Sequence, residues 1–290
     1  MQASIGSLIV SACVALGGGW LGRPAASWRV VASGIGAVGA GLASGYLLLG
    51  FGWVWPPAKA LDRLLELILP AALVIEFAAG MPRISPQLAW GLRIGLAAAT
   101  SPVLLYGSVY LRQELPEWNT LATPTTLLAC GVLLALYWLL LVWLAQRRSG
   151  VSIAIAISMA TQCAGATIML AGYIKGGMAA GPLAVTIATT AIVANLTRNR
   201  AATQSILGVG ILGLFGLLFI GRFYGGLRTP AALLTFLTPL LCWVTEIRAV
   251  RDWKDWQLSA LRLTLITLAL ALLLALAKRD FDRDFAPLLR

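Results

Sequence analysis

Apolar residues dominate the chain in ten long runs, separated by short segments that hold most of the charged residues and prolines. Each run has about twenty residues, the length that a helix needs to cross roughly 30 Å of hydrocarbon. The pattern predicts an all-α, polytopic transmembrane helix bundle with about ten spanning helices. We expect these helices at 3–22, 28–52, 61–80, 87–111, 123–145, 151–172, 178–196, 203–221, 229–247 and 258–277.

The linkers between these runs are too short to hold a soluble domain. We therefore expect one integral-membrane helical domain over 1–277 and a short charged tail over 278–290, which would lie at the membrane interface or be loosely ordered. An inner (cytoplasmic) bacterial membrane is the expected location. The sequence leaves open whether the protein forms a homo-oligomer or joins a larger membrane complex.

Composition agrees with a membrane protein. The chain is 59% hydrophobic and 11% charged, whereas soluble domains are nearer a quarter charged. The net charge of +11 does not indicate a nucleic-acid partner, because the lysines and arginines are spread through short loops instead of forming a stripe. The expected partner is the lipid bilayer.

Metal and cofactor chemistry finds little support in the residue types. The chain has no histidine, and its cysteines stand singly inside apolar runs without CxxC spacing, so we expect no metal and no cofactor. No nucleophile–base pair, phosphate loop or dinucleotide fingerprint is present, which argues against an enzyme. The four cysteines are Cys13, Cys130, Cys163 and Cys242.

The third apolar run carries an unusual set of acids. On a helix, Asp62, Glu66 and Glu76 fall within an arc of about 80°, so they share one face. Pro70 is expected to kink the helix between the last two. The simplest interpretation of Asp62 and Glu66 is interface anchoring with local ion pairing to Arg63.

Glu76 is the deepest of these acids. Without a partner, its neutral form would be favoured and it could carry a proton. A tight turn after this run would bring Arg93 to a similar depth in an antiparallel hairpin, and the pair would then act as an ionised structural clasp. An ion pair that opens for substrate or proton would combine both roles. Ionisable residues inside a membrane are expensive, so we treat both as candidate site residues.

Two parts of the sequence resemble each other. Residues 22–33 are similar to 197–207, and each stretch is followed by a Gly-rich run. The pattern predicts a parallel duplication of a four-helix unit, helices 1–4 and 7–10. The alternative is that composition alone repeats glycine, proline and arginine. The matched residues are Pro70, Glu76 and Arg93 in the first half and Pro239, Glu246 and Arg262 in the second.

The sixth and seventh runs form a polar helix pair. Ser158, Thr161 and Gln162 share one face of the sixth helix. The Gly-rich linker that follows contains Lys175. This linker could be an unwound element lining a cavity, where Lys175 would attract an anion. The alternative is ordinary hydrogen bonding between helices, with Lys175 at the membrane surface.

These features favour a secondary transporter or permease for a small solute or ion. The alternative is a non-catalytic structural or anchor subunit of a larger membrane complex, which short loops and small-residue ridges suit equally well. A membrane enzyme acting on lipid ranks third. A cavity reaching Glu76 and Gln162 would favour transport, and a solid bundle would favour the subunit. The candidate path residues are Glu76, Arg93, Ser158, Thr161, Gln162, Lys175, Glu246 and Arg262.

Overall fold

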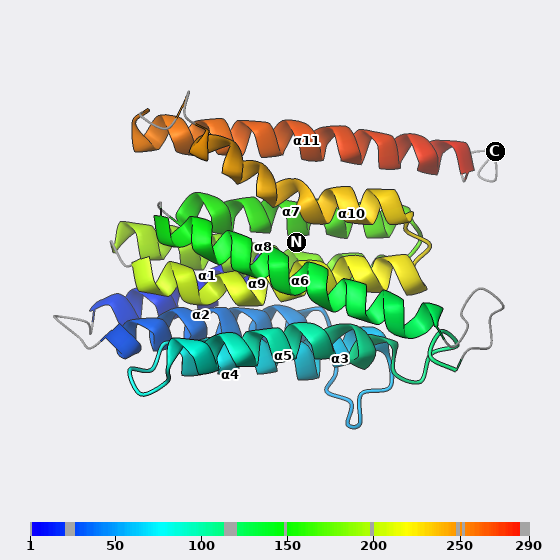
Figure 1. The fold of residues 1–290 in the computed structure, drawn as a ribbon, viewed down its shortest axis with the longest axis horizontal. Coiled ribbons are helices and arrows are strands. Elements are labelled where there is room, and N and C mark those ends of the chain that lie inside the picture. The colour runs from blue at the N-terminus through cyan, green and yellow to red at the C-terminus, as the bar shows by residue number, and fades with distance from the viewer. Residues whose placement is uncertain are drawn as a thin grey trace.

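The computed structural model describes residues 2–20, 27–112, 121–147, 150–197, 200–247, 250 and 253–284. Across these ranges every regular element is a helix, and the long helices run along a common direction (Figure 1). The predicted all-α class is confirmed. Eight helices are long and apolar enough to cross a membrane, as expected of a multi-pass membrane protein.

The helices follow the predicted apolar runs closely. Three of the elements, α3, η1 and α4, form one continuous rod, and α10 continues into η2. The bounds are α1 (Gln2–Trp20), α2 (Ser27–Leu48), α3 (Ala60–Arg63), η1 (Leu64–Ile68), α4 (Leu69–Ala79), α5 (Pro86–Leu105), α6 (Ala122–Arg147), α7 (Val151–Leu170), α8 (Ile174–Leu196), α9 (Arg200–Tyr224), α10 (Thr229–Leu237), η2 (Thr238–Glu246) and α11 (Asp255–Asp284). Neither α1 nor the α3–η1–α4 rod is among the eight long apolar helices, so ten crossings remain a prediction.

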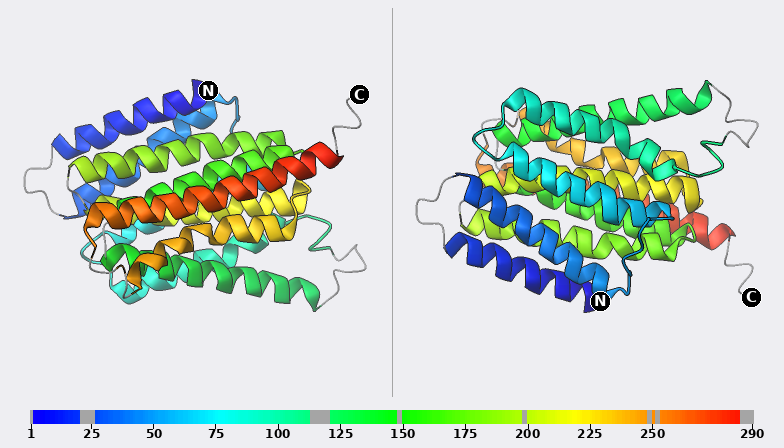
Figure 2. Two further views of the ribbon diagram at one scale, coloured as in Figure 1. Left: turned by 90° about the horizontal axis from the view of Figure 1, so that it is seen from above. Right: turned by 90° about the horizontal axis from the view of Figure 1, so that it is seen from below.

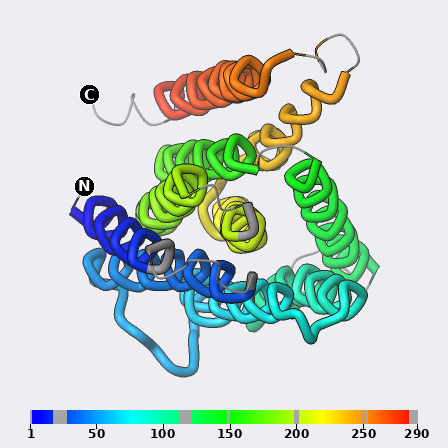
Figure 3. The backbone as a smooth tube through the Cα atoms, turned by 90° about the vertical axis from the view of Figure 1, so that its left-hand side faces the viewer, coloured from blue at the N-terminus to red at the C-terminus, as the bar shows by residue number. Residues whose placement is uncertain are grey.

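The bundle is built around α9, which lies at its centre when the helices are viewed end-on (Figure 3). Glycines along α9 allow this close packing, because a Cβ at Gly213 or Gly216 would collide with Leu183 or Leu64. The pair α1 and α2 packs together and against α8, while α11 lies at the edge over α7 (Figure 2).

A π-helical turn lies directly before Pro70, where the sequence predicts a kink. Pro70 has no N–H to donate, and its ring would crowd the carbonyl of Glu66 four residues earlier. The backbone widens into the π turn η1 just before the proline, and Glu66 lies within that turn. π turns inside α-helices are frequent at functional sites.

Several predicted boundaries differ from the structure. The helices predicted to end at 52 and 111 end earlier, at Leu48 and Leu105. The helix α8 begins at Ile174 and runs through the glycines that follow. Of the two interpretations left open for the Gly-rich linker, the unwound element is therefore wrong, and only a short turn separates α7 from α8. At the C-terminal end α11 continues to Asp284, so the first part of the predicted tail extends the last helix. The rest of that tail lies outside the described residues.

Candidate functional site

The ion pair between Glu76 and Arg93 forms as predicted. Nε of Arg93 donates to Oε1 of Glu76 at 3.0 Å, and Nη2 donates to Oε2 at 2.7 Å. This bidentate geometry is the strong form of the interaction. Glu76 is only 2% exposed and the Arg93 side chain 14%, so both charges are largely removed from solvent and the clasp is a buried one.

A short hairpin places these two side chains opposite each other. Helix α4 ends at Ala79, and α5 begins at Pro86 with Ser85 as its N-cap, whose hydroxyl accepts from the N–H of Leu88 at 3.2 Å. Glu76 is therefore about one turn from the end of α4, and Arg93 about two turns into α5. The ring of Trp90 lies 5.0 Å from the guanidinium carbon of Arg93, which adds a cation–π contact.

Gly208 of α9 makes room for the carboxylate. A Cβ at this position would lie 2.9 Å from Cδ of Glu76 and would also collide with the ring of Trp138. The absence of a side chain in the central helix thus allows the buried ion pair and a fully buried indole to sit side by side.

We expect Gly208→Ala to destabilise the protein by about 1–3 kcal/mol, because the new methyl group must displace Glu76 or Trp138. Gly91→Ala in α5 is the matched control, since nothing lies within 4 Å of its Cβ position and alanine favours helix by up to about 1 kcal/mol. Thermal unfolding in detergent compares the two. Equal unfolding temperatures would contradict this packing argument.

A cavity of about 330 Å³ lies beside the ion pair; we call it the polar cavity. It is walled by α2, α4, α5, α6 and α9, and Gln146, Gln204 and Ser205 contribute polar groups to it. Gln146 lies one residue before the end of α6, and Gln204 lies four residues after the start of α9. The polar cavity is therefore at one end of the bundle, with the ion pair at its inner side.

A second cavity of about 330 Å³ lies between α2 and the α3–η1–α4 rod; we call it the aromatic cavity. Tyr46, Phe51 and Trp53 contribute rings, Asp62 and Glu66 contribute carboxylates, and the remaining walls are apolar. Tyr46 is close to the end of α2 and Asp62 is close to the start of α3. This cavity is therefore at the opposite end of the same helices.

The two cavities follow one seam between α2 and α4. Leu73 lines the aromatic cavity, whereas Glu76 and Gly80 line the polar cavity, and their spacing puts all three on one helix face. A Cβ at Gly39 of α2 would lie 3.5 Å from a methyl carbon of Leu73, so the helices are in close contact there. About one helical turn, from Leu73 to Glu76, separates the two cavities.

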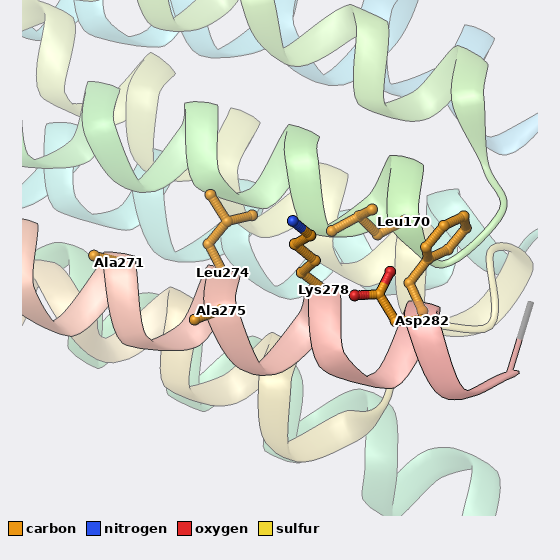
Figure 4. A pocket seen from close by; sticks show the side chains of 7 residues that line it. Leu170, Ala271, Leu274, Ala275, Lys278 and Asp282 are labelled. Carbon is orange, nitrogen blue, oxygen red and sulfur yellow. The ribbon is translucent and has the colours of Figure 1, made fainter. Parts of the chain in front are cut away.

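A third cavity of about 510 Å³ lies between α7 and α11 (Figure 4). Its walls are apolar apart from Lys278 and Asp282, which both project from the C-terminal part of α11. None of the residues that line it belongs to the two cavities of the α2–α4 seam. It has no connection to the ion pair.

The candidate residues of α7 and α8 do not gather around Glu76. Ser158 donates to the carbonyl of Ala184 in α8 at 2.6 Å, and Thr161 donates within its own helix. Gln162 and Lys175 are exposed. These four residues line neither cavity of the seam, and the hydroxyls have the helix-packing contacts that the alternative interpretation expected.

Arg262 is buried in a separate cluster. Its side chain donates to the hydroxyl of Thr245 at 2.6 and 2.8 Å and to that of Ser152 at 3.0 Å, and the residue is 2% exposed. Glu246 is half-buried at the end of η2. The residue that pairs with Arg262 is thus Thr245, one position before the predicted Glu246.

Sequence reasoning missed the polar groups of the polar cavity and the carboxylates and rings that meet in the aromatic cavity. Gln146 and Gln204 lie near helix ends, where glutamine is ordinary, and nothing in their spacing distinguishes them. Asp62 and Glu66 were expected to pair with Arg63. Instead, Arg63 donates to backbone carbonyls, which leaves both carboxylates facing the cavity.

Comparisons with protein-family models, with curated proteins and with solved structures found no match to this chain.

Proposed function

We propose that this protein is a secondary transporter for a small solute, in which the Glu76–Arg93 ion pair is the gate between two cavities. The observation that carries the proposal is their arrangement: both lie on the α2–α4 seam, at opposite ends, with about one helical turn between them. Alternating access requires such a pair of half-paths around a closed centre. A bidentate ion pair beside the barrier provides a contact that protonation of Glu76 or a competing charged solute can break.

The α3–η1–α4 rod has the features of a moving element. The π turn and Pro70 interrupt its regular hydrogen bonding at mid-length. The rod contributes lining residues to each of the two cavities. A bend at the π turn would therefore change the width of both cavities. Transport driven by protons requires a membrane that carries a proton gradient. We therefore propose the bacterial cytoplasmic membrane as the location of the protein.

We also propose the parallel duplication. A constant offset of 169 residues relates the starts of two helical rods, two prolines, and two arginines together with the residues they pair with. Parallel repeats of this kind occur in transporters. The second half keeps the arginine but has threonine in place of Glu76, so one half holds the titratable gate. The related pairs are Ala60 and Thr229, Pro70 and Pro239, Glu76 and Thr245, Pro86 and Asp255, and Arg93 and Arg262.

Thiol labelling tests the two half-paths. In a variant without the native cysteines, Ala43→Cys places a thiol in the aromatic cavity and Ala79→Cys one in the polar cavity. We expect a membrane-impermeant trimethylammonium methanethiosulfonate to label these two variants from opposite sides, measured in right-side-out and inverted vesicles.

Leu268→Cys on the exposed face of α11 is the control, and it should resist the reagent from both sides because lipid covers it. If both cavity thiols react from the same side, the half-paths proposed here do not exist. If neither reacts, the subunit alternative gains support.

A further inference from the structure

The aromatic cavity has the composition of a site for a positively charged, partly apolar ligand. The rings of Tyr46 and Phe51 lie 6.0 Å apart between centroids, and Trp53, which is 71% exposed, lies at the outer part of the cavity. The faces of aromatic rings attract cations. A volume of about 330 Å³ is at the lower end of the range for small-molecule pockets.

The two carboxylates in this cavity are not neutralised by the protein. One oxygen of Glu66 accepts from the N–H of Val54 at 3.0 Å, whereas the other is buried and has no hydrogen-bond partner. Asp62 accepts a long hydrogen bond from the backbone of Lys59 at 3.4 Å. Within the described ranges, neither carboxylate lies within ion-pair distance of a lysine or arginine.

Arg63, the arginine nearest to the two acids in the sequence, forms its hydrogen bonds with backbone carbonyls and not with the acids. Arg63 donates to the carbonyls of Pro57 and Ala58 in the preceding loop and to that of Tyr106 after α5. Asp62 also acts on a residue outside the cavity. Burial raises the pKa of the Tyr173 phenol, and the nearby Asp62 raises this pKa further. Two carboxyl groups without a basic partner in an apolar cavity are costly to ionise unless a cation joins them.

We infer that the aromatic cavity binds an organic ammonium ion that carries an apolar group, with Asp62 and Glu66 holding the charge and Tyr46, Phe51 and Trp53 contacting it. As a statement about the transported substrate, this rests on the proposed transport function. The ammonium ion could belong to a soluble amine or to a lipid headgroup such as choline, since both present the same chemistry to this site.

The second half of the chain supplies an internal comparison. Applying the 169-residue offset places Phe215 at the position of Tyr46, and a cavity of about 270 Å³ lined by Phe215 lies between α6, α9 and α10. Ala231 and Thr235 stand at the positions of Asp62 and Glu66. The related helices therefore pack and leave a cavity beside them without acids at these positions, so helix packing alone does not require Asp62 and Glu66.

The test is binding of benzyltrimethylammonium to the full-length protein in dodecyl maltoside, a detergent with neither charge nor amine, by isothermal titration calorimetry. 4-Phenylbutanoate is the comparison ligand, because it has a similar apolar body and the opposite charge. We expect the ammonium ion to bind and the carboxylate not to bind. The double variant Asp62→Asn/Glu66→Gln should weaken binding at least about tenfold, as expected for losing a charge contact.

Asp280→Asn is the control variant, since this acid pairs with Arg228 on the surface, and it should bind like wild type. Trp53→Leu should weaken binding by about threefold to tenfold through the lost ring face. Equal binding of the two ligands, or unchanged binding by the double variant, would overturn the inference. Competition by dihexanoylphosphocholine would assign the site to a lipid headgroup, and its absence to a soluble amine.

This experiment is independent of transport. Binding that depends on Asp62 and Glu66 can be present in a protein that moves no solute, in which case the transport proposal fails and the binding site stands. Conversely, labelling of the two half-paths without ammonium binding would leave the transporter and remove this substrate class.

Discussion

Replacing Glu76 with glutamine is expected to reduce proton-coupled uptake in proteoliposomes to the level of protein-free liposomes. Glutamine keeps the shape and one acceptor for Arg93, but it cannot be ionised, so the gate loses the group that alternates between charge states. Uptake is measured with an imposed proton gradient. A panel of labelled cationic, anionic and neutral solutes identifies the solute that the wild-type protein accumulates, and the variant is compared on that solute.

The same substitution leaves Arg93 without its counter-charge. Removing one partner of a buried ion pair costs about 3–5 kcal/mol when solvent is excluded. Here the polar cavity beside the guanidinium allows hydration, so we expect a smaller loss and a folded variant. Loss of uptake in a folded protein is the result that assigns a function to Glu76.

The double variant Glu76→Gln/Arg93→Gln separates a gate from a clasp. It removes both charges, so no uncompensated charge remains buried, and the thermal stability should recover toward that of wild type. If Glu76 is the gate, uptake stays absent in the double variant. If the pair is only a structural clasp, uptake recovers together with stability, and the mechanism proposed here is wrong.

A wild-type protein that moves no solute of the panel and co-purifies with defined membrane proteins would favour the subunit alternative. The two cavities would then be packing defects or lipid sites. The labelling experiment separates the subunit from the transporter. A thiol in a packing defect or in a cavity reached only by lipid should not react with an impermeant cationic reagent, whereas a thiol in a half-path should react.

The fold class and the approximate position of each helix could be predicted from the sequence because lipid imposes one strong rule. Every backbone polar group in the hydrocarbon must be satisfied within its own segment, so apolar runs of about twenty residues become helices. The Glu76–Arg93 pair was predictable for a related reason: a short turn fixes the depth of both residues in a hairpin. The depth of each residue in the membrane follows from the number of residues between it and the turn.

The two cavities could not be predicted in this way, because they depend on how each helix is rotated and how closely it meets its neighbours. A shift of one residue rotates a side chain by about 100°. In the 3₁₀-helix η2 the rotation is about 120°, so Thr245 meets Arg262 and the predicted partner, Glu246, points elsewhere. The same limit applies to Gln162, whose polar face was expected in a cavity and lies on the exposed side of α7.

Arg63→Met is expected to destabilise the protein by about 2–4 kcal/mol, since charged hydrogen bonds to several carbonyls are lost together. The guanidinium of Arg63 ties the loop before α3 to the chain after α5: it donates to the carbonyl of Ala58 at 2.7 Å, to that of Pro57 at 3.2 Å and to that of Tyr106. With the residue itself only 9% exposed, water cannot fully replace these bonds. Arg63→Lys should recover only part of the loss, because one ammonium group cannot reach carbonyls on both sides.

Arg228→Met is the matched control for this prediction. Arg228 also donates to an oxygen acceptor, Asp280 at 2.9 Å, but the two side chains are 64% and 38% exposed. An exposed ion pair contributes only about 0–1 kcal/mol, so its loss should barely change the unfolding temperature in detergent. If both methionine variants unfold at the same temperature, burial does not strengthen the contacts of Arg63.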